Sequence, residues 1–193
     1  MQSLEADTES RTGVGLPLTL TGPGLKSGAD WLVSEPPAIR DAFLNSLTKG
    51  ELLALPFLSD LGAMAHQLPR DGEWRTGGIR GGRGGGKTRA GAEWVRAQVE
   101  GSTAFDAGAC QRVALVGETI EQVRYVLNFG DSGILASTPP DRRPDWRATK
   151  QCLTGPHGAE ARIYTAQYPS GLRGPQFDAA WVDELAIWKR AEE

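Results

Sequence analysis

Hydrophobic periodicity is absent from the start of the chain and first appears near residue 37. Residues 1–36 are rich in Ser, Thr, Gly and Pro, a composition that predicts a disordered leader. Apolar residues then recur at four-residue intervals from Ile39 to Leu47, as on one face of a helix. The segment Thr48–Glu51 has the form of a capping box, which predicts a second short helix. We therefore expect N-terminal helices within residues 37–72.

The rest of the chain switches repeatedly between helix-like and strand-like patterns. Apolar residues between 88 and 100 follow a helical period, and 113–116 is a compact apolar strand. A second capping box at 119–122 predicts a helix that runs to about Phe129. The segment 177–182 is a further short apolar run with the pattern of a buried strand. This alternation is typical of an α/β fold.

The segment 132–166 has a different character. Its prolines mark an exposed loop, and two strand-like runs flank 155–158 as a hairpin. Its basic residues have two readings: they contact a DNA backbone, or they form a solvated basic loop. The second is favoured because no groove-reading motif accompanies them. The basic residues are Arg142, Arg143, Arg147 and Lys150, with Trp146 among them.

Composition narrows the class of protein without selecting a function. Apolar residues make up 39% and charged residues 23% of 193 positions, which is ordinary for one globular domain. A net charge of −3 excludes a strongly basic nucleic-acid-binding protein but not a local DNA-binding patch. Cys110 and Cys152 lack the spacing of a disulfide framework or a metal site, so we expect reduced thiols. No apolar stretch approaches the ~20 residues of a membrane span, and a cytoplasmic protein is expected.

The strongest chemical signal is the octapeptide 81–88, which has the form G-x-x-x-x-G-K-[ST]. In such a loop backbone N–H groups surround nucleotide phosphates, the lysine reaches the β- and γ-phosphates, and the hydroxyl ligates Mg²⁺. The alternative is a flexible linker, because seven of the ten residues 77–86 are glycine. The helical pattern that follows favours the phosphate-binding loop (P-loop). The predicted binding residues are Gly81, Gly82, Gly84, Gly85, Gly86, Lys87 and Thr88.

A second cluster, Asp183 and Glu184, follows the strand-like run 177–182. Parallel sheets bind ligands at this C-terminal edge of their strands. In an ATPase, Asp183 would hold Mg²⁺ through water, and Glu184 would orient or deprotonate the attacking water. Taken alone, a strand that ends in a solvated acidic turn explains the pair equally well. The P-loop, 96 residues upstream of Asp183 as counted from Lys87, favours the ATPase.

These motifs, taken in order, resemble the large subunit of phage terminases, in the version found in gene transfer agents and tailed prophages. The resemblance extends from about Ser46 to Lys189. It implies an ATP- and Mg²⁺-dependent motor in the bacterial cytoplasm, coupled to a nuclease, that threads double-stranded DNA into a procapsid. A homo-oligomeric ring, a portal protein and a terminase small subunit are the implied partners. The motifs that carry the resemblance are 81–96, 113–119, 132–135, 139–144 and 172–185.

The resemblance also implies a fold and residue roles. The fold is a P-loop NTPase of the RecA-like, additional-catalytic-glutamate class, with a mainly parallel sheet, here over 73–193. Lys87 and Thr88 serve nucleotide and Mg²⁺ binding, and Asp183 and Glu184 are the metal-site and catalytic carboxylates.

Three further residues receive roles only through the resemblance. Arg83 corresponds to an arginine inside the P-loop that stabilises the γ-phosphate; the alternative is a loop arginine in solvent. Gln67 resembles a glutamine that recognises adenine, and Arg173 resembles a further arginine near the active site.

The chain departs from the family pattern in several places. The segment 74–80 should be a buried strand before the P-loop, yet it has one isoleucine among two glycines and two arginines. Tryptophans are expected around Gly62 and Gly155. The chain ends nine residues after Glu184, so we expect an ATPase core truncated after the Asp-Glu strand, without a nuclease domain.

In this ATPase class the strand after the Asp-Glu strand inserts between it and the P-loop strand. Without it, we expect those two strands either to pair directly or to stand ~10 Å apart, with weak nucleotide binding and little hydrolysis. Three interpretations stay open: a terminase ATPase module, an inactive remnant or subunit-interaction fragment, and a helicase-like DNA translocase.

Overall fold

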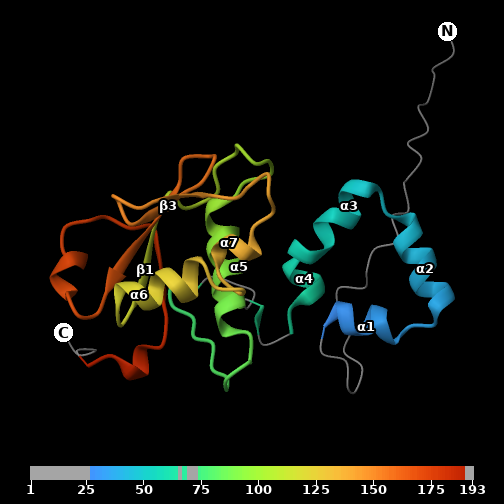
Figure 1. The fold of residues 1–193 in the computed structure, drawn as a ribbon, viewed down its shortest axis with the longest axis horizontal. Coiled ribbons are helices and arrows are strands. Elements are labelled where there is room, and N and C mark those ends of the chain that lie inside the picture. The colour runs from blue at the N-terminus through green and yellow to red at the C-terminus, as the bar shows by residue number, and fades with distance from the viewer. Residues whose placement is uncertain (1–26, 65–66, 69–73, 190–193) are drawn as a thin grey trace, which may run out of the picture.

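The computed structural model describes residues 27–64, 67–68 and 74–189 (Figure 1). A group of short helices lies to one side of an α/β unit, next to helix α5 and away from the strands (Figure 1). These short helices are α1 (Gly28–Ser34), α2 (Pro37–Ser46), α3 (Lys49–Ala54), the 3₁₀ turn η1 (Leu55–Phe57) and α4 (Ser59–Gly62).

The α/β unit contains one five-stranded sheet of order β2-β3-β4-β1-β5. Strand β1 pairs in parallel with β4 and with β5, whereas β2/β3 and β3/β4 are antiparallel. The predicted α/β class is confirmed, but the sheet is mixed: the predicted hairpin supplies the antiparallel pair β3/β4, and β2 adds a second antiparallel pair at the sheet edge. The strands are β1 (Arg112–Gly117), β2 (Asp145–Arg147), β3 (Cys152–Thr154), β4 (Glu160–Thr165) and β5 (Ala179–Val182).

Helices cover one face of this sheet and enclose the core. The helices are α5 (Lys87–Val99), α6 (Ile120–Gln122), the π-helix η3 (Val123–Asn128) and α7 (Ile134–Ser137). Helices α5, α7 and η3 contact one another, and their buried side chains meet those of β1, β4 and β5. Val95, Leu115, Val123, Leu127 and Ile163 are at the centre of this core. Two 3₁₀ turns, η4 (Pro169–Leu172) and η5 (Leu185–Ile187), flank β5 along the chain.

Helix α5 sits on β5 through a glycine. A Cβ atom on Gly91 would overlap ring carbons of Trp181 and would lie 2.6 Å from its indole nitrogen. Ala90, Gly91, Ala92 and Val95 form the buried face of α5. The small residues allow the P-loop helix to approach the strand that precedes Asp183.

The N-terminal helices begin earlier than the sequence predicts. Helix α1 starts at Gly28, inside the segment expected to be a disordered leader. Its N-cap is Ser27, whose hydroxyl accepts a hydrogen bond from the Asp30 N–H at 3.1 Å. A single N-cap serine does not stand out in a sequence in which serine and glycine are common, so the start of α1 is not recognised from composition.

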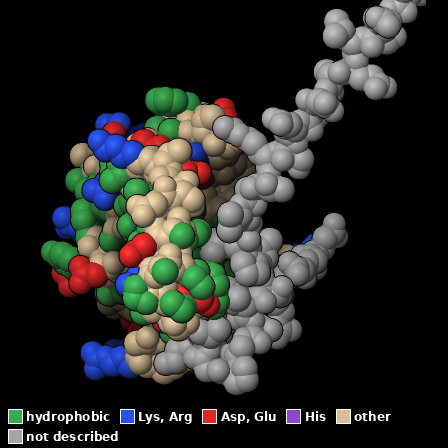
Figure 2. Space-filling view, turned by 90° about the vertical axis from the view of Figure 1, so that its right-hand side faces the viewer, with side chains coloured by type: hydrophobic (Ala, Val, Ile, Leu, Met, Phe, Trp, Pro, Cys, Tyr) green, Lys and Arg blue, Asp and Glu red, His purple; other side chains and the backbone are tan. Residues whose placement is uncertain are grey.

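Helices α2 and α3 are confirmed. Thr48 and Glu51 form the predicted capping box, with the Thr48 hydroxyl accepting from the Glu51 N–H and the Glu51 carboxylate accepting from the Thr48 N–H. Exposed hydrophobic side chains remain on the N-terminal helices, such as Val33 of α1 (71% exposed) and Leu53 of α3 (68%). Figure 2 shows hydrophobic side chains among charged ones on this side of the molecule.

The predicted helix at 119–129 forms mostly as a π-helix. Thr119 caps it through the Gln122 N–H, but the Gln122 side chain accepts from the Glu118 N–H and not from Thr119, so half of the capping box is absent. The wider π turn brings Val123, Leu127 and Asn128 to the buried side together.

The predicted strand at 74–80 does not form, and this prediction was wrong. All seven residues are exposed, and Ile79, the only aliphatic one, is 39% exposed. The Trp74 ring instead lies 6.5 Å from the Trp94 ring of α5. Two adjacent glycines and two arginines offer too little apolar surface for a buried strand. The strand expected before the P-loop is therefore missing among the described residues. It neither pairs with β5 nor stands ~10 Å from it, the two arrangements expected from the sequence.

The hairpin at 155–158 joins β3 to β4, as expected. Cys110 and Cys152 are both free and buried. In the described part of the chain, no helix has the length and apolarity needed to cross a membrane.

Candidate nucleotide-binding site

The P-loop forms a turn that leads directly into α5. Gly86 is the N-cap of that helix and has a φ of 71°, in the left-handed region that favours glycine. Gly84 also has a positive φ, of 79°, and the Gly85 N–H donates to the Gly82 carbonyl at 3.2 Å. The loop therefore places backbone N–H groups at the N-terminus of a thirteen-residue helix, which favours an anion.

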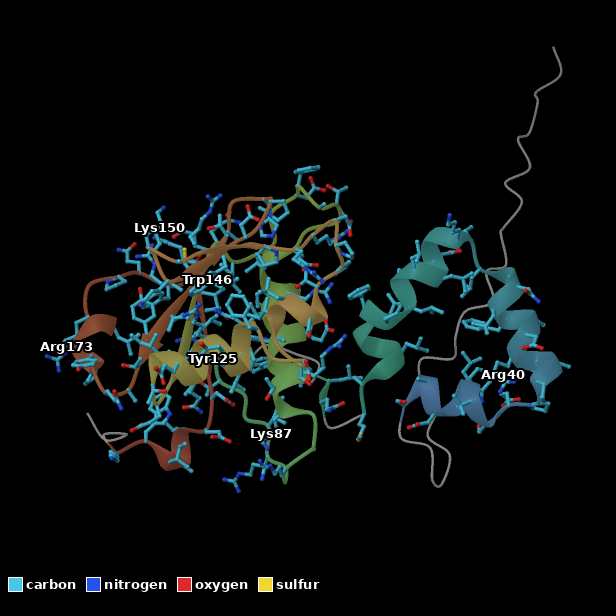
Figure 3. All side chains as sticks on the ribbon, viewed as in Figure 1. Arg40, Lys87, Tyr125, Trp146, Lys150 and Arg173 are labelled. Atoms are coloured by element: carbon cyan, nitrogen blue, oxygen red, sulfur yellow. The ribbon has the colours of Figure 1, made fainter. Side chains whose placement is uncertain are left out.

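Lys87 closes over this loop. Its Nζ donates to the carbonyls of Gly81 at 3.0 Å and Gly82 at 3.1 Å. In Figure 3 the residue lies at the end of α5, beside the loop. Thr88 follows in the first helical turn and is half-buried.

Asp183 lies directly after β5 and is buried. Its N–H donates to the Val116 carbonyl at 2.9 Å, which extends the pairing with β1 by one residue. Burial raises the pKa of the Asp183 carboxyl, and the neighbouring Glu184 charge raises it further. The Lys87 ammonium acts in the opposite direction and lowers that pKa. The P-loop lysine and the acidic pair, distant in sequence, thus share one electrostatic environment.

Glu184 adopts a left-handed backbone conformation, with φ 49° and ψ 43°. This conformation is uncommon and strained for a residue with a side chain, and such strain is concentrated at functional sites. The Glu184 carboxylate is exposed and accepts a hydrogen bond from Gln122 Nε2 at 3.3 Å. Its position therefore depends on a residue from the segment after β1.

Two residues of this segment were missed by the sequence analysis. Gln122 links the Glu118 N–H, through its Oε1 at 3.2 Å, to the carboxylate of Glu184. Glu118 follows β1, and its Oε2 is buried with no hydrogen-bond partner among the described residues. The sequence does offer a signal for Glu118, which is a polar residue directly after the apolar run 113–117. The C-terminal ends of parallel strands meet at one edge of a sheet, so a polar residue there is expected near the acidic pair that follows β5.

A comparison with protein families bears on this site. A family model described as the N-terminal part of the T4likevirus-type terminase large subunit matches residues 79–193, more than half of the chain. The chain belongs to this terminase family. The match includes the P-loop, the whole sheet and the acidic pair. The N-terminal domain of terminase large subunits is generally an ATPase module, and the family points to a role in DNA packaging. No curated protein and no solved structure matches the chain.

Of the three remaining predicted site residues of this terminase chain, two lie at the P-loop and one lies away from it. Gln67 lies against the P-loop, where its Nε2 donates to the Gly85 carbonyl at 3.2 Å. Arg83 is exposed on the loop and forms no ion pair with the residues that the structure describes. Arg173 follows η4, well away from Lys87 in Figure 3, so the structure does not bring it to the site.

The basic loop forms local contacts. Arg142 donates to the carbonyls of Gly101 and Ser102, and Arg147 lies 3.6 Å from the carboxylate of Asp145. Lys150 lies 3.6 Å from Glu160, at the opposite end of the unit from Lys87 in Figure 3. These acidic partners reduce the positive potential, which supports the solvated-loop interpretation over a DNA-binding patch.

The site also fits a divalent cation that binds with nucleotide. Asp183 and Thr88 offer a carboxylate and a hydroxyl, the hard oxygen ligands that Mg²⁺ prefers. A cation would also offset the charge of the adjacent Glu184, which together with burial raises the pKa of Asp183. Within the described ranges, no group of three or more His, Cys, Asp or Glu side chains forms a metal site of its own. Phosphate oxygens and water would complete the coordination of such an ion.

Proposed function

We propose that this chain is the ATP-binding and ATP-hydrolysing module of a terminase that packages double-stranded DNA into a phage-like capsid. The observation that carries the proposal is that α5, which begins at Lys87, packs on β5, which ends next to Asp183, so that the Lys87 charge lowers the pKa of Asp183. A lysine from a P-loop and a buried carboxylate at the end of a parallel strand are the two halves of a phosphate-Mg²⁺ site. The family match supports the biological context, in which DNA, a portal protein and a small subunit are the partners.

In the proposed reaction each residue has a separate task. The backbone N–H groups of the P-loop bind phosphate oxygens, and Lys87 transfers its hydrogen bonds from two loop carbonyls to the β- and γ-phosphates. Thr88 and Asp183 would hold Mg²⁺, which would supply charge neutralisation at the phosphates. Glu184 orients the attacking water and accepts its proton, while Gln122 positions the Glu184 carboxylate.

Turnover by the chain on its own is proposed to be slow. Residues 74–80 are exposed and outside the sheet, so the P-loop is anchored on its helix side and lacks a strand on the other. Phosphoryl transfer depends on pre-organised groups, and a loosely held loop loses part of that advantage. The same observation favours a second candidate, a fragment that binds nucleotide or motor subunits without turnover.

Nucleotide binding and hydrolysis by the purified chain, with and without double-stranded DNA, test the proposal. We expect Lys87→Ala to abolish ATP binding. Glu184→Gln should retain binding but reduce hydrolysis about 10²-fold or more. Lys49→Ala, in α3, and Glu35→Gln, at the C-cap of α1, are matched controls that should behave like the wild type. Binding without measurable turnover would favour the second candidate, and equal ATP affinity in the wild type and Lys87→Ala would refute the proposed ATP-hydrolysing module.

A further inference from the structure

Gln67 uses both ends of its side-chain amide on backbone atoms. Its Oε1 accepts a hydrogen bond from the Met64 N–H at 2.7 Å, and its Nε2 donates to the Gly85 carbonyl at 3.2 Å. Gln67 is half-buried, and its backbone N–H donates to the Met64 carbonyl at 2.8 Å. The amide therefore connects Met64 to Gly85 of the P-loop, which lies 18 residues after Gln67.

The same amide occupies the space beside the N-cap glycine of α5. A Cβ atom on Gly86 would overlap Nε2 of Gln67. Gly86 is also the residue whose positive φ starts the helix. Contact with Gly85 and Gly86 places Gln67 where the loop must keep its shape if its N–H groups are to face phosphate oxygens.

We infer that Gln67 is a positioning residue of the P-loop and that its contribution to nucleotide affinity is independent of the base. This inference rests on the proposed function and differs from adenine recognition, the role suggested by resemblance. An adenine-reading amide would direct its donor and acceptor to the base, whereas here one of each is directed to the backbone. These two side-chain hydrogen bonds, the Gln67 tether, matter most in this chain because 74–80 supplies no strand to hold the loop.

Amide hydrogen exchange of the ligand-free protein tests the tether without nucleotide. Gln67→Met keeps the side-chain length and removes both side-chain hydrogen bonds, and Gln67→Glu removes the donor to Gly85 while keeping an acceptor. Peptides that cover 81–90 should exchange about two- to tenfold faster in both variants, as expected for the loss of one neutral hydrogen bond. Gln176→Ala, an exposed glutamine before β5, is the matched control and should leave these peptides unchanged. Unchanged exchange in Gln67→Met would overturn the inference.

Parallel binding of ATP and GTP tests the second half of the inference. Gln67→Met should weaken both nucleotides by the same factor, so that the ratio of the two dissociation constants equals that of the wild type. A loss confined to ATP would show that Gln67 reads adenine and would overturn the inference. If the wild type binds neither nucleotide, the proposed function is wrong, and the exchange measurement still decides whether Gln67 holds the loop.

Discussion

Replacing Gly91 by alanine tests how the P-loop helix is seated on the sheet. In an exposed helix interior this change stabilises a protein by up to about 1 kcal/mol, because alanine has the higher helix propensity. At Gly91 the new methyl group would overlap the Trp181 ring, at 2.6 Å from Nε1. That ring is only 8% exposed, and Ala92 and Val95 beside it are fully buried, so it has little room to move.

The expected result is a net loss of stability. Overpacking of a filled core costs about 1–3 kcal/mol, which outweighs the gain in propensity. We expect Gly91→Ala to destabilise the protein by about 2 kcal/mol and to lower its melting temperature by about 4–8 °C, as measured by calorimetry or circular dichroism. ATP affinity should fall with it, because α5 carries Lys87 and Thr88.

Gly50→Ala is the matched control. Gly50 lies in helix α3 and is exposed, and the nearest atom to its added Cβ is the Thr48 hydroxyl oxygen at 4.0 Å. This substitution should leave stability unchanged or raise it. Combining Gly91→Ala with Trp181→Phe should cost less than the sum of the two single changes, because the smaller ring relieves the overlap. A rise in melting temperature for Gly91→Ala would refute the packing described for α5 and β5.

Two further predictions concern pH. The pKa of Asp183 is raised by burial, so the ionised carboxylate opposes folding at pH values above that raised pKa. Asp183→Asn should therefore raise the melting temperature at pH 7, with the gain shrinking as the pH falls toward 3.8, while Mg²⁺-dependent ATP binding is lost. The N–H groups of Gln111 and Arg112 lower the pKa of Asp178, so its contribution to stability is present above pH 3.8 and is lost as acid protonates it. Asp178→Asn should lower the melting temperature at pH 7 but not in strong acid; equal effects at both pH values would contradict this.

Local signals in the sequence predicted the elements well. The capping box at 48–51, the apolar strand at 113–116 and the hairpin at 155–158 all form. Each depends on hydrogen bonds or side-chain patterns between residues close in sequence, so that neighbouring residues carry the information. The P-loop belongs to the same class, because its glycines and the helix that follows are contiguous.

The positions of the site residues relative to one another depend on the tertiary structure. The Lys87 charge acts on Asp183 because α5 packs on β5 through Gly91 and Trp181. Parallel strands such as β1 and β5 are not joined by a short turn, so the sequence carries no turn signal for their pairing. The same holds for the bond between Gln122 and Glu184.

Failures of the sequence analysis have the same origin. The strand predicted at 74–80 was inferred from its place before a P-loop, but strand formation depends on how much apolar surface the rest of the fold can bury there. From the order of its residues alone, the chain specified a glycine-rich loop ahead of a helix, an acidic pair and an α/β pattern. Only the packing of distant segments brought the loop and the acidic pair together and left the preceding segment outside the sheet, because contacts between distant residues depend on the whole fold.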